Sequence, residues 1–204
     1  MGNFAPDLPD VRESARVGLL GGSFDPAHEG HVAISLRAMR QAQLDWVWWM
    51  INPQNPLKNT PSMSLCKRLA HARRLVRHPL RRIWVSDIEA RLGTGYTVNT
   101  VQALRQRYPR VRFVLLMGSD NLVELLRWRD WHTLARLLPL LVIPRGVRTA
   151  VSAGFEGRGL YHGHIIPSEC AHRLAEALPP AVCFLSGAKI RLSSTQLRKE
   201  IDGF

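Results

Sequence analysis

A glycine-rich segment with two histidines constrains this chain more than any other feature. Residues 21–31 read GGSFDPAHEGH; they follow the apolar residues 17–20, and a helical pattern begins near Val32. Glycine lets the main chain approach a phosphate without a Cβ in the way, and the N–H groups at a helix start attract anions. A spacing of three places His28 and His31 on nearly the same side of the first helical turn. The segment therefore predicts a strand, a phosphate-binding loop and a helix in that order.

Short apolar segments alternate with helical patterns along most of the chain. The expected strands are the segments 17–21, 46–51, 82–86, 111–117, 140–143 and 181–185. The expected helices are the segments 31–43, 63–77, 97–107, 119–137 and a last one from residue 194. Such an alternation is typical of an α/β protein with a doubly wound parallel sheet and right-handed crossovers. We therefore expect a single domain, residues 1–204, in which residues 1–15 form a flexible N-terminal extension.

The composition argues against a membrane protein and against a disulfide-rich secreted domain. No apolar run approaches the ~18 residues of a membrane span, and residues 1–16 contain no apolar core of a signal peptide. The cysteines, Cys66, Cys170 and Cys183, are too few and too far apart for a disulfide framework or a zinc site. These features are typical of a cytoplasmic protein with reduced thiols and no membrane partner.

The net charge of +12 at pH 7 is compatible with nucleic acid and equally with small polyanionic substrates. The basic residues are scattered, and the densest group has spacings typical of a solvated helix face: Arg68, Arg73, Arg74, Arg77, Arg81 and Arg82. Because composition alone is weak evidence for nucleic-acid binding, we expect small-molecule substrates and no nucleic-acid partner. A basic nucleic-acid-binding module stays as the alternative from another class, and the sequence is compatible with a homo-oligomer.

Polar segments follow most of the expected strands and come once more at the start of the last helix. They are the segments 21–31, 52–58, 87–97, 118–121 and 193–198. In a doubly wound sheet, ligands bind beyond the carboxyl ends of the strands, near the point where strand order reverses. The sequence therefore predicts one site at this sheet edge. Asp87 and Glu89 fit a solvated turn equally well, so they are given no role.

The glycine–histidine segment carries the most specific chemistry. It lacks the Gly-Lys-Ser/Thr ending of a P-loop, and no G-x-G-x-x-G pattern follows the first strand. Two imidazoles beside a glycine-rich turn can donate hydrogen bonds to charge that develops on phosphate oxygens. The alternatives for His28 and His31 are a surface turn or a metal site, but no third histidine or carboxylate has a matching spacing.

The segment Ser193–Thr195 predicts a second phosphate contact. Hydroxyl and N–H groups at a helix start bind anions, and Arg198, one turn further on, can pair with a phosphate through two hydrogen bonds. Helix capping alone is the alternative interpretation of these hydroxyl residues.

The segments 22–31 and 192–198 resemble the two signatures of the nucleotidylyltransferase superfamily. The motifs between them resemble those of the bacterial nicotinate-nucleotide adenylyltransferases: 53–58, 87–89, 96–97, 118–121 and 128–131. The resemblance covers about residues 16–201. It implies a Rossmann-like nucleotidylyltransferase fold and adenylyl transfer from ATP to nicotinate mononucleotide, giving nicotinate adenine dinucleotide and pyrophosphate. The implied cofactor is Mg²⁺, bound mainly through the ATP phosphates, with no protein metal ligand assigned.

The same resemblance implies roles for individual residues. His28, His31 and Arg198 are implied to be catalytic. The implied ATP site consists of Gly21, Gly22, Ser23, Phe24, Gly30, Gly118, Asp120, Ser193, Ser194 and Thr195. The implied acceptor site consists of Lys58, Tyr96, Thr97, Trp128 and Arg129.

Within the acceptor site, Trp128 is expected to stack on the pyridine ring, and main-chain amides near Thr97 and Arg129 to receive the nicotinate carboxylate. Core packing is the alternative for Trp128 and Trp131, because a spacing of three places both on one helical face. The competing activities are a transferase of the same fold acting on pantetheine phosphate and an enzyme that prefers nicotinamide mononucleotide.

Overall fold

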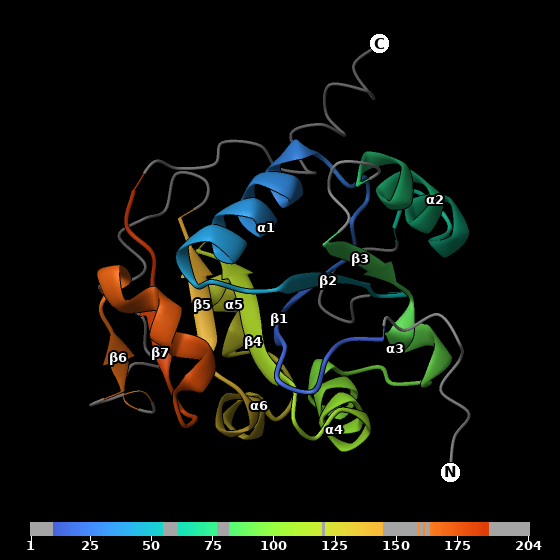
Figure 1. The fold of residues 1–204 in the computed structure, drawn as a ribbon. Helices are drawn as coiled ribbons and strands as arrows, with labels where there is room; N and C mark the ends of the chain where they lie inside the picture. The colour runs from blue at the N-terminus through green and yellow to red at the C-terminus, as the bar shows by residue number, and fades with distance from the viewer. Residues whose placement is uncertain are drawn as a thin grey trace.

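The structure is a computed structural model that describes residues 10–54, 61–76, 82–119, 121–144, 159, 161 and 164–187. One seven-stranded parallel sheet runs through these residues in the order β3-β2-β1-β4-β5-β7-β6 (Figure 1). The strands are β1 (Arg16–Gly22), β2 (Trp46–Ile51), β3 (Ile83–Ser86), β4 (Arg112–Gly118), β5 (Leu140–Ile143), β6 (Ile165–Ile166) and β7 (Val182–Phe184). Strand order reverses between β1 and β4, so the carboxyl ends of these two strands mark the switch point at which such sheets bind ligands. The expected α/β fold with a doubly wound parallel sheet is confirmed.

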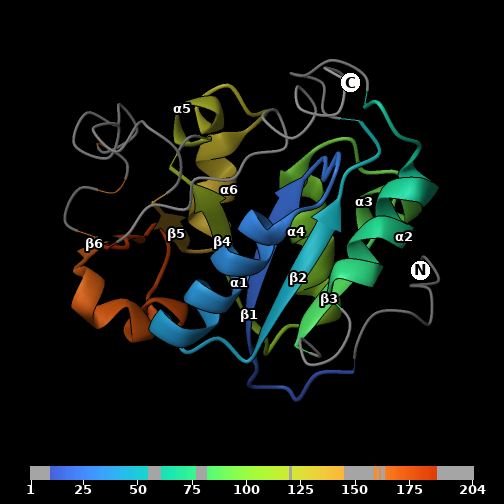
Figure 2. The ribbon, with the colours of Figure 1, turned by 90° about the horizontal axis from the view of Figure 1, so that it is seen from above.

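Helices cover both faces of the sheet (Figure 2). They are α1 (Glu29–Gln41), α2 (Leu65–Leu75), α3 (Ile88–Arg91), α4 (Thr97–Arg107), α5 (Leu122–Leu125), α6 (Trp131–Leu137) and the 3-10 helix η3 (Ser168–Glu176). Apolar residues of α1, α2 and η3 pack in one core layer, and those of α3 to α6 pack in the other. The neighbouring residues Trp48 and Trp49 of β2 point into opposite layers, because successive side chains of a strand face opposite sides.

The glycine in the middle of β1 is required by a close approach between strand and core. A Cβ added at Gly18 would lie 2.7 Å from Cδ1 of Leu116 and 2.8 Å from Cδ1 of Leu44. These leucines would have to move to admit even an alanine. Gly18 therefore sets how tightly one core layer packs on the strand that leads into the site.

The prediction of one helix over residues 119–137 is wrong. The structure has two short helices, α5 and α6, joined by turns in which Asp130 adopts a left-handed backbone with φ of 51°. Trp128 lies in this connection, so it does not share a helical face with Trp131. The connection contains neither glycine nor proline, so the sequence gives no signal for the break. The prediction therefore followed the helical period across it.

Three further elements were not predicted. The single turn α3 is too short for a helical period to be detected, and η3 and β6 lie in a segment for which no element was predicted. The last expected strand is confirmed as β7, whereas the helix expected from residue 194 lies outside the described residues. Within the described ranges, no helix is long and apolar enough to span a bilayer.

The N-terminal segment is described from residue 10 onward. Val11 and Ala15 are buried in the core layer of α3 to α6. Nη2 of Arg12 donates to Oδ1 of Asp45 at 2.9 Å, which ties the segment to the turn before β2. The chain thus packs on the sheet before β1 begins.

Candidate functional site

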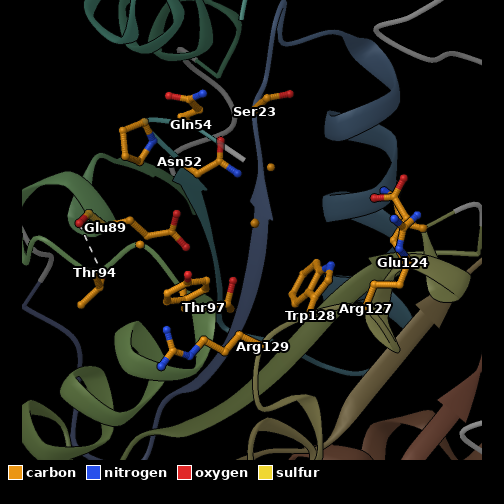
Figure 3. Close-up of a pocket in the computed structure, with 16 residues that line it drawn as sticks. Ser23, Asn52, Gln54, Glu89, Thr94, Thr97, Glu124, Arg127, Trp128 and Arg129 are labelled. Atoms are coloured by element: carbon orange, nitrogen blue, oxygen red, sulfur yellow. Dashed lines mark hydrogen bonds between the residues drawn. The ribbon is translucent and has the colours of Figure 1, made fainter. Parts of the chain in front are cut away.

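A cavity of about 340 Å³ opens where β1, β2, β3 and β4 end (Figure 3). Its walls come from the end of β1, the segment after β2, the loop between α3 and α4, and the connection from β4 to α6. Its lining residues are Gly21–Ser23, Asn52–Gln54, Glu89, Thr94–Thr97, Asn121, Glu124 and Arg127–Arg129. The predicted site edge therefore contains a cavity.

Many of the predicted site residues meet in this cavity. Those that line it are Gly21, Gly22, Ser23, Tyr96, Thr97, Trp128 and Arg129. Those that are buried without lining it are Phe24, His28, Gly30, His31 and Gly118. Those that lie outside the described residues are Lys58, Asp120, Ser193, Ser194, Thr195 and Arg198.

The two histidines cap helix α1 reciprocally. The N–H of Gly30 donates to Nδ1 of His28 at 3.0 Å, and the N–H of His28 donates to Nδ1 of His31 at 3.2 Å. Their ring centroids lie 3.9 Å apart, and the two residues are only 5% and 8% exposed. Because both Nδ1 atoms accept hydrogen bonds, each neutral ring carries its proton on Nε2. The local fold thus fixes the tautomer of both imidazoles, each with an Nε2–H donor.

The ring of His31 is held in place by the core beneath it. Phe24, with φ of 49°, stacks on Trp49 at a centroid distance of 5.1 Å and lies 4.6 Å from the His31 ring. Oγ of Ser35 donates to the carbonyl oxygen of His31 at 2.8 Å and accepts from Nε1 of Trp49 at 2.8 Å. Phe24 therefore packs against the imidazole from the core side.

A buried arginine joins the ends of β1 and β2. Nη1 of Arg68 donates to the carbonyl oxygens of Ser23 at 2.6 Å and Asn52 at 2.8 Å, and Nη2 donates to that of Pro53 at 2.9 Å. Its Nε donates to the carbonyl oxygen of Met63 at 3.1 Å, and the residue is 1% exposed. The prediction of a solvated helix face is therefore wrong for Arg68, which faces the site loops.

The environment of Arg68 includes one carboxylate. Burial lowers the pKa of Arg68, and the nearby carboxylate of Asp25 raises it. The Asp25 carboxylate itself accepts from the N–H of Ser62 at 2.7 Å and that of Met63 at 3.2 Å. Arg68 and Asp25 together tie the glycine–histidine segment to the start of α2.

The opposite wall of the cavity is aromatic. Helix α4 begins at Thr97, and no side chain caps it at Tyr96. The guanidinium of Arg129 lies 4.7 Å from the centre of the Tyr96 ring, and Trp128 is half-buried beside them. The start of α4 and the connection between α5 and α6 thus face the cavity together (Figure 3).

Glu89 is a cavity residue to which the sequence analysis gave no role. It is 6% exposed, lines the cavity and points its carboxyl group inward (Figure 3). Burial raises the pKa of Glu89 to about 7. Its neighbour Asp87 is different, because Asp87 accepts from Nε of Arg91 at 2.6 Å. Two acids at alternate positions of a strand end look alike in sequence, so nothing there separated the paired one from the buried one.

No cluster of three or more histidine, cysteine, aspartate or glutamate side chains that could hold a metal occurs in the described part of the chain. Among the described residues, Glu89 and Glu124 are the acidic ones in the cavity lining.

The fold is that of solved nucleotide-transferring enzymes. The chain is similar to the nicotinic acid mononucleotide adenylyltransferase of Plasmodium falciparum complexed with APC, with a TM-score of 0.66 and 16% identity. The similarity covers 91% of this chain and 83% of that one. At 16% identity, the similarity supports the fold alone.

Sequence comparison identifies the family. The Cytidylyltransferase-like family model matches residues 19–200. A probable nicotinate-nucleotide adenylyltransferase of Ruegeria sp. (strain TM1040) is 47% identical over 90% of this chain and 96% of its own length. Another from Cereibacter sphaeroides (strain ATCC 17025) is 51% identical over 89% of this chain and 96% of its own length. This chain therefore belongs to the cytidylyltransferase-like family and, within it, to the nicotinate-nucleotide adenylyltransferases.

Proposed function

We propose that this protein transfers the adenylyl group of ATP to nicotinate mononucleotide, a step of NAD biosynthesis. The products are nicotinate adenine dinucleotide and pyrophosphate. The observation that carries the proposal is the cavity at the switch point, where the glycine-rich end of β1 faces an aromatic wall that contains Trp128. The names of the relatives support the same reaction.

The reaction needs no nucleophile from the protein. A phosphate oxygen of the mononucleotide attacks the α-phosphorus of ATP, and the bond from that phosphorus to the bridging oxygen of the β-phosphate breaks. The electron pair leaves with pyrophosphate. In such a displacement, the protein supplies position and charge stabilisation. Nε2–H groups of His28 and His31 donate to phosphate oxygens as negative charge develops there.

The remaining ATP contacts follow the resemblance to the family. Backbone groups of residues 21–24 and Gly30 pass close to the phosphates, and Gly118 and Asp120 line the adenosine site. Ser193–Thr195 and Arg198 hold the β- and γ-phosphates. Mg²⁺ would enter with ATP, held mainly by the ATP phosphates, and would neutralise part of their charge.

The acceptor occupies the aromatic end of the cavity. Trp128 stacks on the pyridine ring, and the amides near Thr97 and Arg129 receive the carboxylate, which suits N–H donors. Tyr96 borders the same pocket, and Lys58 neutralises a phosphate. We place the enzyme in the cytoplasm, as a single domain that is compatible with a homo-oligomer and has no nucleic-acid partner.

The deciding experiment measures pyrophosphate release from ATP with three acceptors in parallel. They are nicotinate mononucleotide, nicotinamide mononucleotide and pantetheine phosphate, and a reaction without acceptor is the control. We expect turnover to be fastest with nicotinate mononucleotide. Absence of turnover with this acceptor would end the proposal. Salt-sensitive binding to DNA or RNA without any pyrophosphate release would favour the nucleic-acid module instead.

Trp128→Ala should raise KM for nicotinate mononucleotide about tenfold and KM for ATP far less. The reason is that losing an aromatic stacking partner costs about 0.5–1.5 kcal/mol beyond area burial. Trp131→Ala is the matched control, because Trp131 is half-buried nearby but does not line the cavity. Equal changes in both KM values would show that Trp128 only packs.

A further inference from the structure

The buried carboxyl group of Glu89 is the feature of the cavity that the reaction above does not use. It comes from α3, and its main-chain carbonyl accepts from the N–H of Thr94 at 3.0 Å, which fixes it against the loop before α4. In the described part of the chain, no hydrogen bond or ion pair holds the carboxyl oxygens themselves. An unpartnered carboxyl group buried against a cavity is costly, so its retention there points to a ligand.

We propose that Glu89 determines whether the enzyme accepts an acid or an amide on the pyridine ring of its acceptor. The inference rests on the proposed function, which places that substituent near Thr97 and Arg129. Glu89 borders the same end of the cavity. Residues 94–97, which lead from Glu89 to the start of α4, line the cavity without a gap.

The protonated and ionised forms of Glu89 favour different ligands. A protonated carboxyl group donates an O–H to the nicotinate carboxylate, and a hydrogen bond to a charged acceptor is short and strong. An ionised carboxylate repels the nicotinate carboxylate but accepts an N–H from a nicotinamide group. The preference for the acid is therefore present below the pKa of Glu89 and is lost as pH rises through it.

Among the described residues, the charged groups beside Glu89 are engaged with other partners. On α3, Asp87 and Arg91 pair with each other. From the start of α4, the phenol of Tyr96 faces the cavity, with Arg129 over its ring.

Across the cavity, the connection from β4 to α6 contributes Glu124 and Arg127. The described residues of the segment after β2 that line the cavity, 52–54, have uncharged side chains. Burial is the cause that raises the pKa of Glu89 to about 7, near physiological pH.

The test compares kcat/KM for nicotinate and nicotinamide mononucleotides as a function of pH. Both acceptors carry the same phosphate and use the same ATP, so titration of phosphate or histidine cancels in their ratio. For the wild-type enzyme, the acid-to-amide ratio should fall about tenfold between about pH 6 and about pH 8, because kcat/KM follows the protonated fraction of the free enzyme.

Glu89→Gln should make the ratio independent of pH, because the glutamine amide donates an N–H to the carboxylate at every pH. Glu124→Gln is the matched control, since it removes a second carboxyl group of the described cavity lining and should leave the pH dependence intact. A flat wild-type ratio, or an unchanged slope in Glu89→Gln, would overturn the proposal.

A binding measurement checks the same idea without catalysis. Titration calorimetry in buffers of different ionisation enthalpy should detect net proton uptake near pH 7.5 when nicotinate mononucleotide binds to the wild-type protein. The uptake should be larger than with nicotinamide mononucleotide, and the difference should vanish in Glu89→Gln. An equal difference in the variant would contradict the assignment. Failure of the wild-type protein to release pyrophosphate with either acceptor would instead refute the proposed function.

Discussion

Replacing His31 with alanine should lower kcat for adenylyl transfer by about two to three orders of magnitude, the loss typical when a transition-state donor is removed. The Nε2–H of His31 is lost, and with it a hydrogen bond to charge that develops on the phosphates. The measurement is steady-state pyrophosphate release at saturating ATP and nicotinate mononucleotide. His172→Ala, an exposed histidine of η3, should leave kcat unchanged.

His31 also supports the helix start, so two further variants separate catalysis from folding. Asparagine places an oxygen near the position of Nδ1, so His31→Asn retains an acceptor for the N–H of His28 but has no Nε2 donor. Glutamine extends an amide N–H toward the position of Nε2. We expect the asparagine variant to fold normally and remain slow, and the glutamine variant to recover part of kcat. Normal kcat in His31→Asn would refute the donor role.

Arg68→Met should destabilise the protein by about 3–5 kcal/mol. The substitution leaves the carbonyl oxygens of Ser23, Asn52 and Pro53 without their donor, and each buried acceptor left unsatisfied costs about 1–3 kcal/mol. It also removes the positive charge beside the buried Asp25 carboxylate. The measurement is the free energy of unfolding in urea without substrates.

Two further variants serve as comparisons for the loss of stability in Arg68→Met. Arg73→Met, on the exposed side of the same helix, should change the free energy of unfolding by less than about 0.5 kcal/mol. The loss of unfolding free energy in Arg68→Lys should lie between those of Arg68→Met and Arg73→Met. An ammonium group keeps the charge but cannot reproduce the planar fork of the guanidinium, which reaches both strand ends. A loss below about 1 kcal/mol in Arg68→Met would mean that water replaces the guanidinium at these carbonyl groups.

The sheet could be predicted because its determinants are local. Continuous apolar runs such as 113–117 identify buried strands, and their alternation with helical patterns indicates a parallel topology. The glycine–histidine segment could be located for the same reason, since a strand, glycines and a helix start are adjacent in sequence. The reciprocal cap could not, because histidine is not a usual capping residue.

What sequence reasoning missed depends on long-range contacts. Arg68 and Arg73 sit on one helix and look alike in sequence, yet only Arg68 meets the carbonyl groups of two strand ends. Asp87 pairs with Arg91, whereas Glu89 is buried and lines the cavity. In the break between α5 and α6, Asp130 has a left-handed backbone and Trp128 lines the cavity, and the spacing of apolar residues indicates neither.

The reciprocal cap of α1 makes the imidazoles of His28 and His31 part of the helix start. A proton added at either Nδ1 would replace an acceptor by a donor that opposes another N–H. The neutral state of both rings is therefore tied to the start of the helix, because the cap needs an acceptor at each Nδ1. In this molecule, the two Nδ1 atoms hold the start of the helix, and the Nε2 atoms of the same two rings are the donors of the proposed reaction.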